Sequence, residues 1–125
     1  MCIRDRTWPW EPHASDLCPD KGRQQNGYIT IGAARQKKLF YWFYEAREGP
    51  SSKPLMIYLN GGPGCSSLFS VLRENGPCKV AKDGHSLHHN PHSWTELANM
   101  LWIDQPIDVG FSYASPAYDL SLIHI

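Results

Sequence analysis

The residues with the clearest chemical potential lie in a glycine-rich turn, Asn60–Ser67, with the sequence NGGPGCSS. The turn follows an apolar run, Leu55–Leu59, and precedes a short stretch of helical character, Leu68–Glu74. Glycines allow a backbone to turn sharply and to approach a ligand closely. Backbone N–H groups exposed at such a turn can bind an anion or stabilise a developing oxyanion. A turn without any chemical role has a similar composition, so paired glycines alone do not establish a site.

A cluster of histidines in one polar segment suggests a metal site as an alternative. The cluster consists of His85, His88, His89 and His92. Histidine is a common zinc ligand, but no Glu or Cys falls among these four in a known ligand pattern. We therefore expect residues 79–96 to form a solvated, loop-rich segment that holds no metal ion.

The elements that must position the turn are expected to be strands. Tyr28–Ile31 is β-branched and flanked by glycines, and Leu39–Ala46 is rich in aromatic residues. Together they predict an antiparallel hairpin. Leu55–Leu59 and Ala98–Asp104 are short continuous apolar runs, a pattern typical of strands buried on both faces of a mostly parallel sheet. The helical stretch after the turn would end at Gly76-Pro77.

Length and charge narrow the class of protein. The chain has 125 residues, which suits one modest domain. Twelve basic and twelve acidic residues give a net charge of zero, without the basic excess typical of nucleic-acid binding. No apolar run approaches the ~18 residues of a membrane-spanning helix. We therefore expect neither a nucleic-acid partner nor a membrane partner.

The four cysteines are Cys2, Cys18, Cys65 and Cys78. None forms a CxxC pair, so zinc-ribbon and thioredoxin interpretations have no support. Four thiols allow three complete pairings, and the sequence does not rank them. Their number is compatible with an oxidising compartment.

The string from Leu59 to Ser67 closely resembles the signature of the serine carboxypeptidase family. Further motifs of that family follow in its order and at plausible spacings, over about residues 26–115. These motifs are Gly27–Ile31, Leu39–Glu45, Glu74–Pro77, Asn90–Trp94, Asp104–Pro106 and Gly110–Tyr113. One departure is Tyr58, where several relatives carry Trp, and it concerns the shape of the pocket rather than the chemistry.

The resemblance implies an α/β fold. We expect the N-terminal part of an α/β-hydrolase, an antiparallel hairpin leading into a mostly parallel sheet, incomplete in this chain. It also implies an enzyme that removes C-terminal residues from peptides or proteins at acidic pH. The mechanism would be acyl transfer through a Ser–His–Asp triad, without a cofactor. The expected location is the secretory pathway, with the protein in a vacuole or lysosome or outside the cell.

Family roles transfer to five residues of this sequence. Gly62 corresponds to the glycine of the oxyanion hole. Asn60 and Glu74 correspond to residues that grip the terminal carboxylate of the substrate, and Gly61 shapes the loop beside them. Cys65 corresponds to a cysteine bridged to a partner farther along the family's chain, so we expect it to be unpaired here.

The catalytic triad of the family has no counterpart in these residues. Its nucleophile lies in Gly-Glu-Ser-Tyr-Ala-Gly, which does not occur here. Gly110–Ala114 approaches the GxSxG pattern around Ser112, but the resemblance places this stretch in a loop without a nucleophile. Asp104 and His92 could be mistaken for the other triad members. We expect Asp104 to be structural and to orient the loop at Gln105-Pro106.

Other functions remain open for a chain with these motifs. Relatives of the family include acyltransferases and hydroxynitrile lyases, and a noncatalytic binding module is a further alternative. Met1–Arg6 lacks the apolar stretch of a signal peptide. Met1–Arg6 and Leu120–Ile125 resemble translated sequencing adapters, so we expect both to be non-native ends. Residues 7–119 would then be the N-terminal portion of one domain.

The apolar character of the predicted strands indicates low stability for this chain. Leu55–Leu59 and Met100–Ile103 suit a sheet covered on both faces, whereas few covering segments are visible in the sequence. We expect the chain to leave apolar surface and strand edges exposed, and therefore to be marginally stable and prone to associate.

Overall fold

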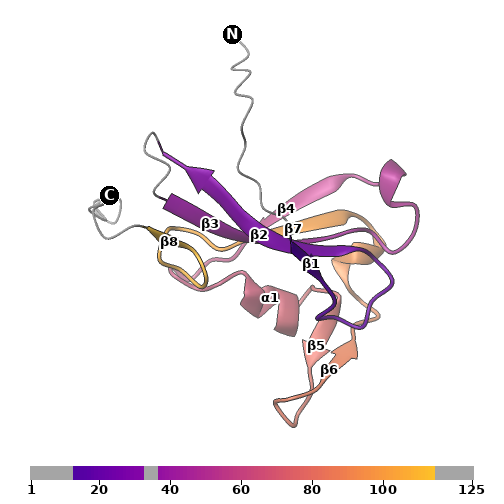
Figure 1. The fold of residues 1–125 in the computed structure, drawn as a ribbon. Coiled ribbons are helices and arrows are strands. Elements are labelled where there is room, and N and C mark those ends of the chain that lie inside the picture. Colours follow the sequence, from indigo (N-terminus) through magenta and orange to yellow (C-terminus); the bar gives the residue numbers. More distant parts are fainter. Residues whose placement is uncertain (1–12, 33–36, 115–125) are drawn as a thin grey trace.

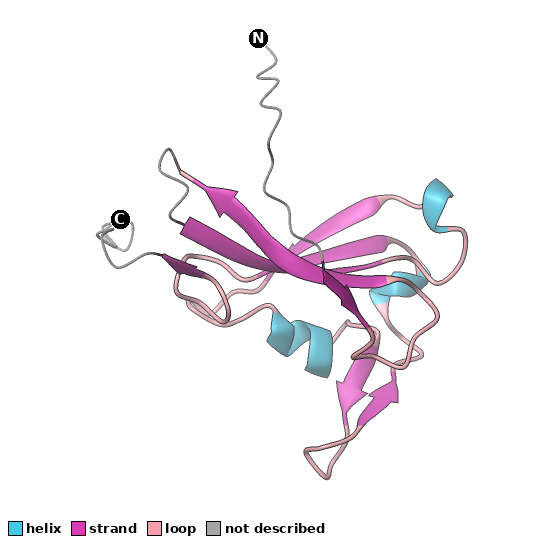
Figure 2. Ribbon diagram, in the orientation of Figure 1, coloured by secondary structure: helices cyan, strands magenta, loops and turns pink. Residues whose placement is uncertain are grey.

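The computed structural model describes residues 13–32 and 37–114 (Figure 1). The expected non-native ends, Met1–Arg6 and Leu120–Ile125, lie outside the described residues. The described chain is built around one twisted sheet, with helix α1 (Leu68–Arg73) on one face and a small separate hairpin beyond it (Figures 1 and 2).

The main sheet is mixed. Its strand order is β1-β2-β3-β7-β4, and β8 pairs with β3 beside this path. Only β4 and β7 run parallel, whereas the other described pairs are antiparallel. The strands are β1 (His13–Ser15), β2 (Gln24–Ile31), β3 (Lys37–Tyr44), β4 (Leu55–Leu59), β7 (Asn99–Ile103) and β8 (Tyr113–Ala114).

The connection between the two parallel strands contains most of the remaining structure. After α1, β5 (Cys78–Val80) and β6 (Leu87–His89) form an antiparallel hairpin within the segment expected to be loop-rich. The 3-10 turn η2 (Trp94–Glu96) ends this connection, whereas the 3-10 turn η1 (Pro50–Ser52) precedes β4. Among the described residues, no helix has the length and apolar character needed to cross a membrane.

The expected hairpin is confirmed, because β2 and β3 pair along their full lengths in an antiparallel register. The expectation of a mostly parallel sheet is wrong for the described residues. A parallel pair needs a long crossover, and the described chain makes one such crossover, between β4 and β7. The antiparallel hairpin and the single crossover between parallel strands still agree with the expected incomplete α/β arrangement.

The core lies between α1 and the neighbouring strands β3 and β7. Trp42 and Tyr44 stack with ring centroids 5.8 Å apart, and Tyr44 meets Trp102 edge-on at 5.7 Å. Met100 and Val71 are fully buried in the same cluster, which places the apolar side of α1 against the sheet. This aromatic packing explains why the run Leu39–Ala46 folds as a strand.

Strand β4 differs from the expectation that it is buried on both faces. Leu55, Ile57 and Leu59 are 57%, 60% and 54% exposed. There are two reasons. β4 is the edge strand, with β7 as its one partner among the described strands. These three residues also lie on the face opposite Tyr58, which packs against the core. The related expectation that apolar surface and a strand edge stay exposed is confirmed at this position.

Candidate functional site

The glycine-rich turn Asn60–Ser67 lies at the carboxyl ends of the parallel strands β4 and β7. Two hydrogen bonds hold it there. The Asn60 N–H donates to Ser67 Oγ at 3.0 Å, and Ser67 Oγ donates to the Ile103 carbonyl at 2.6 Å. Ligands of open α/β sheets bind outside the carboxyl ends of the strands, so the turn occupies the expected place for a site.

Asp104, the residue after β7, fixes the same turn. Its buried carboxylate accepts hydrogen bonds from Ser66 Oγ at 2.7 Å and from the Ser67 N–H at 2.7 Å. It also accepts from the Phe111 N–H at 3.0 Å, on the loop after Gln105-Pro106. Asp104 is therefore a structural residue, as expected, and it joins the glycine-rich turn to the neighbouring loop.

Gly62 needs to be glycine for two reasons. Its φ of 144° is a conformation that L-residues rarely adopt, and an added Cβ would lie 3.0 Å from Cys65 Sγ. In the described part of the chain, the Gly62 N–H makes no hydrogen bond. A backbone donor of this kind is available to a ligand oxygen.

The five site residues predicted from the sequence meet around one cavity, which we call the turn cavity. Its volume is about 560 Å³. It is lined by Asn60, Gly61, Gly62, Cys65, Ser66, Phe69 and Glu74. Cys65 is exposed and carries a free thiol. The structure thus brings these residues together, although their chemical roles stay predictions.

Ser70 lies behind the turn cavity and was not singled out from the sequence. Its hydroxyl oxygen is 2.7 Å from Glu74 Oε2 and 3.2 Å from Asn60 Oδ1. The side chain is fully buried. The available signal was its spacing of four residues from Glu74, which places the two side chains on one helical face.

Ser112 and the histidines do not form an alternative site in the described residues. Ser112 is 3% exposed, donates to the Asp104 carbonyl at 2.6 Å and accepts from the Phe40 N–H at 2.8 Å. A hydroxyl engaged in this way is a structural bridge rather than an accessible nucleophile. His89 contacts Arg47, and no group of three potential metal ligands occurs within the ranges described.

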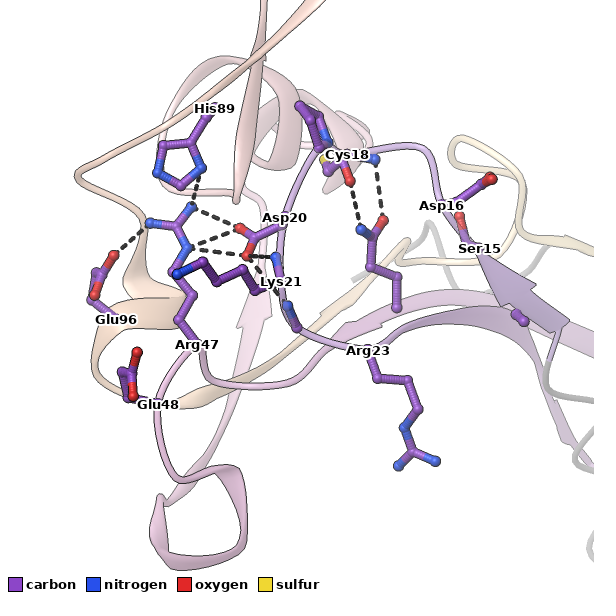
Figure 3. A pocket seen from close by; sticks show the side chains of 14 residues that line it. Ser15, Asp16, Cys18, Asp20, Lys21, Arg23, Arg47, Glu48, His89 and Glu96 are labelled. Carbon is purple, nitrogen blue, oxygen red and sulfur yellow. Dashed lines mark hydrogen bonds and ion pairs between the residues drawn. The ribbon is translucent and has the colours of Figure 1, made fainter.

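A larger cavity, of about 760 Å³, lies beside Arg47 at the other end of β3 (Figure 3). Arg47 pairs with Asp20 at 2.7 Å, and both side chains are almost fully buried. It also bonds Glu96 and lies 3.3 Å from His89 Nδ1. We call these four residues, together with the adjacent Cys18–Cys78 disulfide, the Arg47 corner.

The charges of the Arg47 corner satisfy one another. Burial of the guanidinium lowers the pKa of Arg47, but hydrogen bonds and attraction from Asp20 and Glu96 outweigh it and leave that pKa raised. The cavity is larger than the turn cavity, yet its main cation is already bonded. We therefore assign the candidate site to the turn cavity, where backbone and side-chain donors stay available.

Comparison with known proteins identifies the family of the chain. A sequence profile described as serine carboxypeptidase matches residues 13–122. The chain belongs to the serine carboxypeptidase family. The family resemblance carried by the motifs around the turn is therefore confirmed.

Individual members of the serine carboxypeptidase family match closely over part of their length. The chain is 48% identical over 98 residues to Serine carboxypeptidase-like 26 of Arabidopsis thaliana, covering 76% of this chain and 22% of that protein. It is 47% identical over 101 residues to Carboxypeptidase Y homolog A of Leptosphaeria maculans, covering 81% and 18%. It is 57% identical over 77 residues to Carboxypeptidase S1 homolog A of Arthroderma otae, covering 62% and 12%.

A solved structure of a serine carboxypeptidase shares the fold. The match is to Kex1(delta)p, a prohormone-processing carboxypeptidase from Saccharomyces cerevisiae. The TM-score is 0.65 at 33% sequence identity, covering 80% of this chain and 23% of the other. The chain thus spans about a fifth of the length of the first relatives it matches.

Proposed function

We propose that this chain supplies the oxyanion loop and the carboxylate-binding residues of a serine-type carboxypeptidase. The observation that carries the proposal is the turn cavity, where Gly62, Asn60 and Glu74 line one space in a member of the family. The substrate would be the C-terminus of a peptide or protein. The enzyme would act at acidic pH in the secretory pathway, in a vacuole or lysosome or outside the cell.

In this proposal three hydrogen-bond donors contact different parts of the substrate or intermediate. The Gly62 N–H stabilises the oxyanion of the tetrahedral intermediate, because it has no acceptor of its own among the described residues. Asn60 Nδ2 donates one hydrogen to the Ser66 carbonyl at 3.3 Å, which leaves its second hydrogen for the substrate carboxylate. A protonated Glu74 donates another hydrogen bond, whereas an ionised Glu74 would repel the carboxylate.

The bond-breaking groups would come from residues beyond the described ones. A serine would attack the scissile carbonyl, a histidine would take its proton, and an aspartate would orient that histidine. The leaving amino acid would depart, and water would release the acyl group. Cys65 would form a disulfide with a partner outside this chain, consistent with its exposed thiol.

The decisive experiment begins with the full coding sequence that contains this chain. We expect its protein to release the C-terminal amino acid from a blocked dipeptide and to require a downstream serine. Acyl transfer to another acceptor, or cyanohydrin cleavage, without peptide hydrolysis would favour an acyltransferase or a hydroxynitrile lyase. Binding of peptide acids without turnover would favour a binding module.

Glu74→Gln tests the carboxylate-binding role within that enzyme. Because the substrate carboxylate binds before the chemical step, the role of Glu74 should appear mainly in KM. A Gln side chain donates a hydrogen bond at every pH, so the variant should lose much of the rise in KM toward neutral pH with peptide acids. Glu48→Gln, at an exposed position in the Arg47 corner's cavity, is the matched control. An unchanged pH profile in Glu74→Gln would leave Glu74 as a structural residue.

A further inference from the structure

We propose that Ser70 is a positioning residue for carboxylate binding, because its one hydroxyl holds the inward oxygens of both Asn60 and Glu74. Their outward donor groups are then left for the ligand. This inference rests on the proposed function of the turn cavity. It assigns selectivity for a free C-terminal carboxylate to a residue that touches no substrate.

Three oxygens surround the Ser70 hydroxyl. Glu74 Oε2 lies at 2.7 Å, Asn60 Oδ1 at 3.2 Å and Tyr58 Oη at 3.4 Å. A serine hydroxyl carries one proton, which is shared here in a bifurcated hydrogen bond. Glu74 Oε2 accepts the stronger component and Asn60 Oδ1 the weaker one. Ser70 is fully buried, so its hydroxyl makes these contacts inside the protein.

The bond to Ser70 leaves one oxygen of Glu74 without a protein partner. Glu74 is exposed and lines the turn cavity, and among the described residues only Ser70 bonds its carboxyl group, through Oε2. An oxygen that already accepts a hydrogen bond from a buried hydroxyl is the poorer place for the acid proton. The proton of a neutral Glu74 therefore resides on Oε1, where it can be donated to a ligand carboxylate.

Asn60 is oriented by a matching pair of contacts. Its Nδ2 donates to the Ser66 carbonyl, which can only accept, so the amide oxygen must face Ser70. Ser66 is itself held by Asp104 through a 2.7 Å hydrogen bond. The side chain of Asn60 is thus fixed from both sides, and its remaining N–H is available to the cavity.

Removal of the hydroxyl changes both groups at once. Without Ser70 Oγ, the acceptor oxygens of Asn60 and Glu74 lose their shared donor. A protonated Glu74 can then turn its proton inward to satisfy Asn60, which withdraws it from the ligand. The loss should fall on ligands with a free carboxylate and spare those with an amide in its place.

The test compares binding and hydrolysis of blocked dipeptide acids and amides by the full-length protein whose coding sequence contains this chain. At acidic pH, Ser70→Ala should raise the dissociation constant and KM for the acid about tenfold. The values for the amide should change less than twofold, and kcat should be nearly unchanged. Ser93→Ala is the matched control, because Ser93 is a buried serine that does not line the turn cavity and that bonds the Asn75 carbonyl.

The outcomes separate this inference from the proposed function. An unaltered protein that prefers peptide acids, with the preference intact in Ser70→Ala, overturns the positioning role alone. Equal weakening of acid and amide ligands in Ser70→Ala also overturns it, since a merely structural serine would act in this way. An unaltered protein that shows no preference for acids in binding or hydrolysis overturns both proposals.

Discussion

The Arg47 corner and the turn cavity lie at opposite ends of the stretch where β3 and β7 pair, and they differ in whether their polar groups have partners. Tyr44 pairs with Met100 at the first end, and Tyr41 pairs with Ile103 at the second. At the Arg47 corner, the buried Arg47–Asp20 pair and a disulfide join residues of this chain to one another. At the turn cavity, the Gly62 N–H and the second Asn60 N–H have no partner among the described residues.

This contrast separates scaffold from site. Buried charges are tolerated when they are paired, and the Arg47 corner meets that condition within the chain. Donors without partners are costly in a core but useful beside a ligand, and the turn cavity keeps them exposed. The comparison therefore predicts large effects on stability at the first end and on ligand binding at the second.

The largest expected effect on stability is removal of the Cys18–Cys78 disulfide. The bond joins residues 60 positions apart, so its loss frees a long loop in the unfolded chain. Replacing both cysteines by alanine should lower the free energy of unfolding of this chain by about 4 kcal/mol.

Urea denaturation followed by circular dichroism measures this change. Cys65→Ala is the matched control, since Cys65 is exposed and unpaired, and its effect should stay within about 0.5 kcal/mol. Equal effects of the two replacements would show that the Arg47 corner does not depend on its disulfide.

A smaller effect on stability is expected when either of two methionines that lie side by side in the sheet is replaced by alanine. Met56 of β4 pairs with Met100 of β7, but Met56 is 40% exposed and Met100 is fully buried. Met100→Ala should lower the free energy of unfolding by about 3 kcal/mol, because it leaves a cavity in the core. Met56→Ala should cost less than about 1 kcal/mol.

Measurement at several protein concentrations sharpens this contrast. If copies of the chain associate through β4, the cost of Met56→Ala should grow with concentration while that of Met100→Ala stays constant. Equal costs for the two at every concentration would mean that β4 is covered, contrary to the exposed strand described here.

Much of this fold was predictable because local sequence determined it. The bounds of β4 and the start of α1 agree with expectation. The β2–β3 hairpin also forms, although β2 begins earlier than Tyr28 and β3 ends at Tyr44, before the predicted Ala46. The glycine-rich turn is continuous in sequence, and Glu74 follows it after two helical turns, so one cavity could be expected to contain both. The family match explains why their types and spacing were recognisable.

Other features depend on contacts between distant residues. An apolar run shows that Leu55–Leu59 favours burial, but its exposure follows from its place at the edge of the sheet. The pairing of Cys18 with Cys78 required the three-dimensional structure, since the sequence left three pairings open. Ser70 likewise acquires its role from Asn60, which belongs to another element.

The smallest expected effect lies in the β5–β6 hairpin, which the disulfide joins to the Arg47 corner through Cys78. Hydrogen bonds from the Ser86 hydroxyl, and then from the Ser86 and His85 N–H groups, lower the pKa of Asp83 from 3.8 to about 2. The folded state therefore favours the ionised carboxylate. Its contribution to stability is present above pH 3.8 and is lost as the pH falls toward about 2.

An NMR titration of the Asp83 carboxyl group tests this effect directly. The midpoint should lie near pH 2 in the unaltered chain, and Ser86→Ala should move it upward toward 3.8. Because Asp83 is fully exposed, Asp83→Asn should change overall stability little at neutral pH while removing the dependence on pH within this window. Ser51→Ala, at an exposed serine away from this hairpin, should leave the midpoint unchanged. A midpoint near 3.8 in the unaltered chain would show that the hydrogen bonds from Ser86 and His85 to Asp83 do not persist in solution. The β5–β6 loop would then lack the fixed conformation that the Arg47 corner has.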